Sequence, residues 1–140
     1  MKRSLQALIR RRAGDRCEYC QLPQSHDPVP FEIDHIIAEK HQKATELENL
    51  CLCCYACNRR KGPNVAGIDP KTGKIVPLFN PRTHHWSRHF RWDGPVLVGR
   101  TSSGRATVLV LGINSDNRVD FRLELIDEGE FPPDRFAFLQ

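Results

Sequence analysis

Two Cys-x-x-Cys pairs constrain the fold of this chain more than any other feature of its sequence. Cys17-Glu-Tyr-Cys20 and Cys54-Tyr-Ala-Cys57 lie on either side of a histidine, His35. Each pair suits a tight knuckle that directs both sulfurs at one ion, and a structural zinc ion takes four such ligands in a tetrahedron. The spacing therefore predicts a structural Zn²⁺ site, with redox dithiols or free core thiols as the alternatives. Its expected ligands are Cys17, Cys20, Cys54 and Cys57.

Length and composition favour this interpretation over a disulfide scaffold. With 140 residues the chain can form one domain with a modest core. It begins Met1-Lys2-Arg3-Ser4 and contains no apolar stretch as long as a signal peptide or a membrane span requires. We therefore expect a protein of the reducing cytoplasm, without membrane association and without an evident obligate protein partner.

Two further cysteines, Cys51 and Cys53, are surplus to a four-ligand site. They lie in the apolar segment 50–53, which is typical of a short strand. We interpret them as small buried residues, and the alternative is that one of them replaces one of the four ligands.

Positive charge is concentrated beside the cysteine pairs. The net charge is only +4, but one cationic run, 10–12, precedes the first pair and another, 59–61, follows the second. Such runs are either solvated surface or contacts to an anionic partner. Next to the cysteine and histidine motifs, the second interpretation is favoured, with phosphate groups as the expected contacts. The candidate contacts are Arg11, Arg12, Arg59, Arg60 and Lys61.

Hydrophobic spacing and turn residues predict a mixture of short helices and strands. In the first half we expect a helix over 4–13 with Ser4 as N-cap and Gly14 as stop, a loop over 15–30, a strand over 31–37, a loop over 38–45, a capping-box turn over 45–48, a strand over 50–53 and a helical turn ending at Gly62. In the second half we expect a hairpin over 68–76, strands over 96–98, 108–111 and 119–125, and a tail from 127 to 140. A buried helix over 106–113 is the alternative to the strand over 108–111.

Three polar residues between and after the cysteine pairs suggest a second kind of metal site. The carboxylate of Asp34 and the amide oxygen of Asn58 are hard ligands that suit Mg²⁺ or Mn²⁺, whereas thiolates suit zinc. His35 follows Asp34 directly, and an imidazole with a pKa of about 6.5 can accept a proton from water at neutral pH. The sequence thus predicts two metal environments of different hardness.

The order of these motifs resembles the HNH endonuclease family. The residues that carry the resemblance are Cys17-x-x-Cys20, Asp34-His35-Ile36, Asn49-Leu50, Cys54-x-x-Cys57-Asn58 and Lys61-Gly62, within residues 15–62. The similar branch of the family has a ββα-metal core braced by a four-cysteine zinc. One departure is the absence of the glycine pair that many members carry after the histidine, because Gln42-Lys43 occupies that region.

The resemblance implies roles for particular residues. His35 is the expected general base, Asp34 and Asn58 hold a catalytic Mg²⁺ or Mn²⁺ ion, and Asn49 steadies the loop that presents His35. The implied reaction is phosphodiester cleavage of DNA that leaves 5′-phosphate and 3′-hydroxyl ends. The two competing hypotheses are a non-catalytic, zinc-stabilised nucleic-acid-binding module and a protein-interaction or redox module in which the cysteines act as thiols.

We therefore expect a one-domain α+β protein with a ββα-metal core, an N-terminal helix and a partly β C-terminal extension. Residues 1–83 form the nuclease core with the zinc site and the hairpin, and residues 84–140 pack on it within the same structural domain. The second half resembles the extension of a group of small bacterial HNH proteins through Phe79-Asn-Pro-Arg82, Trp86, His89-Phe90-x-Trp92 and Gly104-Arg-Ala-Thr-Val108. Its histidines, His84, His85 and His89, are candidate metal ligands or nucleic-acid contacts, although packing is favoured for them and for the aromatic residues.

Overall fold

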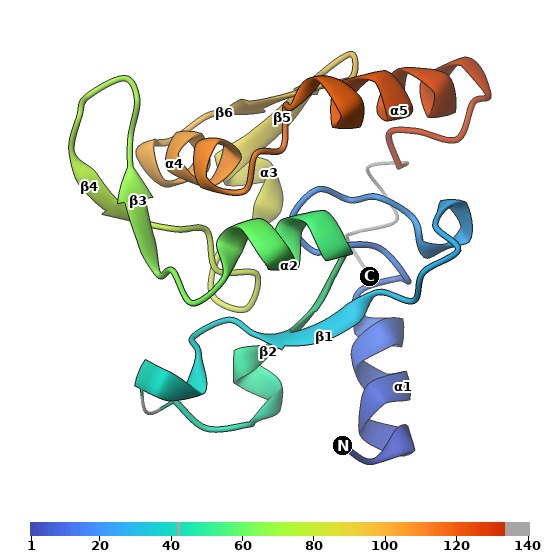
Figure 1. Cartoon of the computed structure of the whole chain (residues 1–140), viewed down its shortest axis with the longest axis vertical. Coiled ribbons are helices and arrows are strands. Elements are labelled where there is room, and N and C mark those ends of the chain that lie inside the picture. Colours follow the sequence, from blue (N-terminus) through green and yellow to red (C-terminus); the bar gives the residue numbers. More distant parts are fainter. Residues whose placement is uncertain (42, 134–140) are drawn as a thin grey trace.

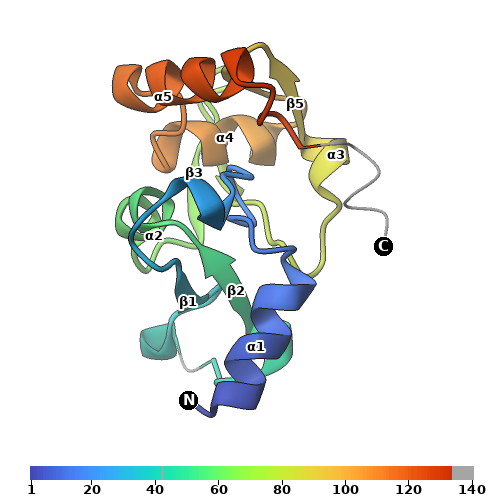
Figure 2. The same ribbon diagram turned by 90° about the vertical axis from the view of Figure 1, so that its right-hand side faces the viewer.

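The computed structural model describes residues 1–41 and 43–133, and it has the expected α+β architecture (Figures 1 and 2). Within the described residues, three separate two-stranded antiparallel sheets alternate with helices. The elements are α1 (Arg3–Arg12), β1 (Glu32–His35), β2 (Leu50–Cys53), α2 (Tyr55–Lys61), β3 (Ala66–Ile68), β4 (Ile75–Pro77), α3 (Trp86–His89), β5 (Phe90–Asp93), β6 (Val96–Gly99), α4 (Ser102–Val110) and α5 (Asp116–Asp127). Three short 3₁₀ turns are η1 (Gln24–His26), η2 (Glu39–His41) and η3 (Leu47–Asn49).

The ββα order of the predicted core is present in β1, β2 and α2. β1 runs antiparallel to β2, so that His35 at the end of β1 pairs with Leu50 at the start of β2. All four residues of β2 are buried, which explains why its sequence is continuously apolar rather than alternating. α2 begins directly after Cys54 and ends at Gly62, whose positive φ of 52° stops the helix as expected.

The N-terminal helix is present, but its predicted cap is wrong. α1 begins at Arg3, one residue before Ser4, and its N-cap is Lys2, which makes no side-chain cap bond. Ile9 is fully buried against the core, and α1 lies against β2. Gly14 follows the helix with a φ of 63°, as the sequence indicated.

The turn before β2 also differs from its prediction. The capping-box spacing over 45–48 placed Thr45 as a cap, but η3 starts at Leu47 and its N-cap, Glu46, makes no side-chain bond. The Thr45 hydroxyl instead contacts His35. A hydroxyl with a partner from another segment is not free to cap its own turn.

The hairpin and one C-terminal strand follow the sequence prediction, whereas two predicted strands are helical. β3 pairs with β4 across residues 69–74, and β6 contains the expected strand 96–98. Residues 108–110 lie in α4, so the helical alternative is correct, although α4 ends at Val110 and Leu109 is exposed. Residues 119–125 lie in α5 rather than in a strand. The buried residues of α5, Arg122 and Leu125, are three positions apart, as on one face of a helix, and Phe121 and Leu123 are exposed.

The second half of the chain contacts the cysteine-containing half through side chains. Trp86 donates its indole N–H to the carbonyl of Tyr19 at 2.8 Å, and Trp92 donates to the side chain of Gln21 at 2.7 Å. α5 ends at Asp127, where the tail was expected, and residues 134–140 of that tail lie outside the described residues. The division at residues 83 and 84 within one domain stays a prediction. None of the helices in the described ranges is long and apolar enough to cross a membrane.

Candidate functional site

The two Cys-x-x-Cys pairs meet at one point in the structure. The sulfurs of Cys17, Cys20, Cys54 and Cys57 all lie within 4.8 Å of one another, and all four residues are buried. Cys20 Sγ and Cys54 Sγ are 3.7 Å apart, close to the ~3.8 Å separation of two ligands in a tetrahedron with metal–sulfur bonds of about 2.3 Å. The Cys57 amide points at Cys54 Sγ at 3.5 Å, which is the knuckle geometry that the spacing predicted. The four cysteines are therefore positioned to hold a metal ion.

The surroundings of the four sulfurs suit thiolates bound to a cation. Burial raises the pKa of Cys17, but hydrogen bonds from neighbouring thiols outweigh burial and hold that pKa well below its usual range. Burial and the hydrogen bond with Cys17 raise the pKa of Cys57 well above its usual range. Four buried thiols cannot all ionise unless a cation neutralises them, and a divalent ion does so.

A cation from the C-terminal half reaches this cluster. Arg118 of α5 donates from Nη2 to Cys57 Sγ at 2.9 Å and from Nη1 to the carbonyl of Leu111 at 2.7 Å. Burial lowers the pKa of Arg118, but attraction to the sulfurs of Cys57, Cys20 and Cys54 outweighs burial and raises it. The sequence reasoning missed Arg118 because no local motif connects a helical arginine to a cysteine 61 residues away.

The surplus cysteines do not join the cluster. Cys51 and Cys53 are both fully buried in β2, and the group of side chains able to hold a metal ion contains neither. Burial raises the pKa of Cys51 to about 12, so it is a protonated thiol at neutral pH. The interpretation of both residues as small core side chains is consistent with these positions.

His35 lies at the edge of the fold rather than among hydrocarbon side chains. Its side chain is 23% exposed, and its Nε2 is 2.8 Å from the hydroxyl of Thr45 and 3.4 Å from a carboxylate oxygen of Glu39. The Thr45 hydroxyl in turn donates to Glu39 at 3.3 Å. The Nδ1 of His35 has no hydrogen-bond partner among the described residues. Thr45 and Glu39 were not predicted to contact His35, although the four-residue spacing of His35 and Glu39 is typical of a contact within a turn.

Asn49 holds the segment that follows His35. Its side chain is buried, accepts from the Ile37 amide at 2.9 Å, and donates to the carbonyls of Ile37 at 2.9 Å and Ala44 at 3.1 Å. One amide group thus fixes both ends of the loop after β1. This geometry is what a residue that steadies the histidine loop requires.

Asp34 and Asn58 come from β1 and α2, the two elements that pack against each other at this site. Burial raises the pKa of Asp34, and the charge of Lys61 and the backbone amide of His35 offset part of that rise. Asn58 donates its amide N–H to the carboxylate of Glu32, two residues before Asp34 on β1. Glu32 was not among the predicted site residues, although period-two alternation puts it on the same face of β1 as Asp34.

Two of the five predicted phosphate contacts, Lys61 and Arg12, donate hydrogen bonds to backbone carbonyls of the protein. Lys61 is 2% exposed and donates its ammonium to the carbonyl of Ile36 at 2.7 Å, so its prediction as a surface contact is wrong. Arg12 donates to the carbonyls of Leu47 at 2.9 Å and Leu50 at 2.5 Å, which makes its guanidinium a strut between α1 and β2. These carbonyls belong to the 3₁₀ turn before β2, to the start of β2 and to the residue after β1, and the long cationic side chains donate hydrogen bonds to them. Arg12 is nevertheless exposed, as are Arg11, Arg59 and Arg60.

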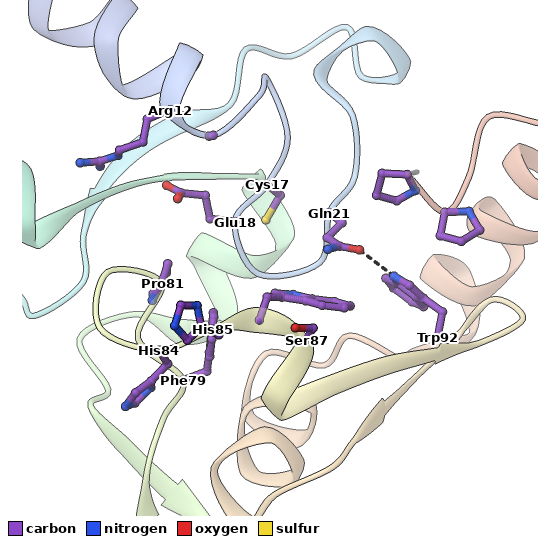
Figure 3. Close-up of a pocket in the computed structure, with 14 residues that line it drawn as sticks. Arg12, Cys17, Glu18, Gln21, Phe79, Pro81, His84, His85, Ser87 and Trp92 are labelled. Atoms are coloured by element: carbon purple, nitrogen blue, oxygen red, sulfur yellow. Dashed lines mark hydrogen bonds between the residues drawn. The ribbon is translucent and has the colours of Figure 1, made fainter. Parts of the chain in front are cut away.

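Two of the C-terminal histidines, His84 and His85, line a cavity of about 470 Å³ beside Cys17 together with aromatic residues, whereas His89 does not line it (Figure 3). His84 accepts from the Asn80 amide at 3.0 Å, and His89 lies 2.6 Å from the Thr101 hydroxyl. Their ring centroids are 5.0 Å apart. In the part of the chain that the structure describes, only the cysteine cluster brings together three or more His, Cys, Asp or Glu ligands. These contacts agree with the packing interpretation.

A buried four-cysteine centre attached to a ββα unit with a histidine at the end of its first strand defines an HNH-type domain. Residues 17–64 match the model of the HNH endonuclease family, and this chain therefore carries an HNH endonuclease domain over those residues. Over 116 residues the chain is 25% identical to Septu protein PtuB of Bacillus thuringiensis, and the match covers 81% of this chain and 42% of that protein. The chain thus spans less than half the length of this relative. No solved structure matches it.

Proposed function

We propose that this protein is a metal-dependent endonuclease that hydrolyses phosphodiester bonds in DNA. The observation that carries the proposal is the arrangement of His35 in an HNH domain: one ring nitrogen contacts Thr45, and the other has no hydrogen-bond partner among the described residues. A ring nitrogen without a protein partner is available to accept a proton from a water molecule aimed at phosphorus.

His35 acts as the general base through Nδ1. In the tautomer with hydrogen on Nε2, that N–H donates to Thr45, and Thr45 donates to Glu39. When water attacks phosphorus, its proton passes to Nδ1 and the bond from phosphorus to the 3′-oxygen breaks. The 3′-oxygen leaves as an alkoxide that takes a proton from solvent, and a 5′-phosphate and a 3′-hydroxyl result. The Glu39 carboxylate, 3.4 Å from Nε2, stabilises the imidazolium formed in this step, as the acid of a hydrolase triad does.

Asp34 and Asn58 are the residues that would hold the catalytic divalent ion, Mg²⁺ or Mn²⁺. With its N–H₂ directed to Glu32, Asn58 has a side-chain oxygen without a donor among the described residues, which suits a hard cation. When bound, such an ion would neutralise the charge on the phosphate and on the leaving oxygen. Asn49 is a positioning residue, because its three bonds fix the loop that follows His35.

The cysteine site takes a structural zinc ion in this proposal. Four buried sulfurs are soft ligands that select zinc over magnesium. Arg11, Arg59 and Arg60 are left as contacts for DNA phosphates, since they are exposed and, unlike Arg12, donate to no backbone carbonyl of the described residues. The isolated chain is expected to act on DNA without an obligate protein partner, in a reducing cytoplasm.

The rival function is a non-catalytic, zinc-stabilised module that binds nucleic acid, and a plasmid assay separates the two. Supercoiled plasmid is incubated with Mg²⁺ or Mn²⁺ and with wild type, His35→Ala or His85→Ala, a matched removal of an exposed histidine outside the site. The nuclease proposal expects nicking by wild type and His85→Ala and its loss in folded His35→Ala. Equal nicking by all three proteins would mean contamination or a different base, and no nicking by a zinc-loaded wild type would favour the binding module.

A further inference from the structure

The β3–β4 hairpin presents an apolar face that no described part of the protein covers. Its inner face, Gly67 and Val76, lies against α4, and a Cβ added at Gly67 would come within 2.6 Å of Val110. On the outer face Ile68 pairs directly with Ile75, and these side chains are 54% and 78% exposed. The other two residues of the outer face, Ala66 and Pro77, are also exposed. The entire outer face is therefore apolar and open to solvent.

The tip of the hairpin is held in one conformation. Asp69 is fully buried, accepts from the Lys71 amide at 3.0 Å and from the Thr72 hydroxyl at 2.9 Å, and forms a two-bond ion pair with Arg105 of α4 at 2.9 Å. The Asp69 amide also donates to the carbonyl of Lys74 at 2.9 Å. A preformed tip loses little conformational entropy when it binds a partner.

Charge on and beside the hairpin favours an anionic partner. Between residues 59 and 77 the exposed charged side chains are Arg59, Arg60, Lys71 and Lys74, all cationic. The only acid in that stretch, Asp69, is buried and paired with Arg105. An apolar face between cations suits the DNA minor groove, where proteins place lysines and arginines on phosphates and insert isoleucine or proline against the bases.

The hairpin also adjoins the proposed catalytic site. The chain passes from α2 through residues 62–65 directly into β3, and His41, in the loop after His35, lies 3.1 Å from the carbonyl of Pro63. In Figure 1 α2 ends on the side of the molecule from which the hairpin projects. A duplex bound across α2 can therefore extend along the hairpin.

We propose that the β3–β4 hairpin is a second contact for duplex DNA, with Lys71 and Lys74 on the phosphates and Ile68 and Ile75 in the minor groove. The inference rests on the proposed nuclease function because it assigns that enzyme a duplex substrate. It also predicts binding that can be measured without cleavage.

The test measures binding of a labelled, A·T-rich duplex to the full chain in a His35→Ala background that leaves the DNA intact. Lys71→Gln/Lys74→Gln should weaken binding and reduce the slope of log affinity against log salt by about 1.8. Ile75→Ser should weaken binding about tenfold, as expected when one isoleucine loses its burial. The matched controls, Arg88→Gln/Arg91→Gln and Val29→Ser, remove equally exposed cations and an exposed apolar side chain elsewhere and should leave binding unchanged.

Thermal unfolding confirms that each variant is folded. Displacement of the hairpin-dependent complex by a minor-groove ligand such as netropsin would support the inference, and resistance to it would contradict the groove assignment. Unchanged DNA affinity in the hairpin variants would overturn the inference. It would also be overturned if these variants lost self-association of the protein instead of DNA binding, because the hairpin would then be a protein interface. If wild type nicks plasmid but DNA binding does not depend on the hairpin, only this inference is refuted. If DNA binding depends on the hairpin but wild type does not nick plasmid, only the nuclease proposal is refuted.

Discussion

Replacing Arg118 by methionine should weaken metal binding at the cysteine cluster. Four thiolates and one divalent ion carry a net charge of −2, and Arg118 donates to Cys57 Sγ at 2.9 Å from a largely buried position. A hydrogen bond to a charged group contributes about 1.5–3 kcal/mol. Loss of such a partner of a metal ligand typically reduces metal affinity by about 10- to 100-fold, which agrees with that energy.

The assay is competition for zinc between the protein and a chromophoric chelator, measured without any DNA or activity. Arg118→Met should release zinc at a chelator concentration roughly 10- to 100-fold lower than wild type, while Arg118→Lys, which keeps the charge, should lose less. Arg91→Met, a matched change at an exposed arginine, should behave as wild type. Equal zinc affinity in wild type and a folded Arg118→Met would show that Arg118 serves only the Leu111 carbonyl and would refute the reasoning.

Two further predictions concern the histidine and the hairpin. Thr45→Val should lower kcat for plasmid nicking about tenfold or more with a small change in KM, because the base loses its orienting hydroxyl, and an unchanged kcat would exclude that role. Asp69→Asn should lower the melting temperature at pH 7. Since the Arg105 ion pair holds the pKa of Asp69 below its ordinary value, this stabilisation is present above the unfolded pKa of about 3.9 and is lost as the pH falls through the folded pKa. The difference in melting temperature from wild type should therefore shrink below about pH 4, and a pH-independent difference would contradict the ion-pair account.

Local spacing was sufficient to predict the metal centre, because the ligands of a knuckle are separated by two residues. The same holds for the end of α2, which Gly62 stops as expected, whereas the start of α2 directly after Cys54 was not predicted. Thr45 and Glu39 were not predicted, since their role depends on a loop that brings a hydroxyl back to the end of β1. Sequence patterns specify elements well, but contacts between loops depend on the tertiary fold.

The errors in the second half have a physical origin as well. In α5 the residues Val119, Phe121, Leu123 and Leu125 alternate with polar ones, which imitates the period of a strand. The segment is nevertheless helical, although its N-cap Ser115 makes no side-chain cap bond, because the arginines of α5 supply buried contacts instead of hydrocarbon alone. Similarly, Lys61 was assigned to the surface because of its charge, although its ammonium satisfies a buried carbonyl.

The most direct measurement of the central claim is the initial rate of plasmid nicking by zinc-loaded His35→Ala with and without added imidazole. If His35 is the general base, the variant should be slowed by at least about 100-fold, the usual contribution of acid–base catalysis. Imidazole in solution should restore part of the rate to this variant and leave wild type unaffected. Nicking by folded His35→Ala at the wild-type rate would contradict the account.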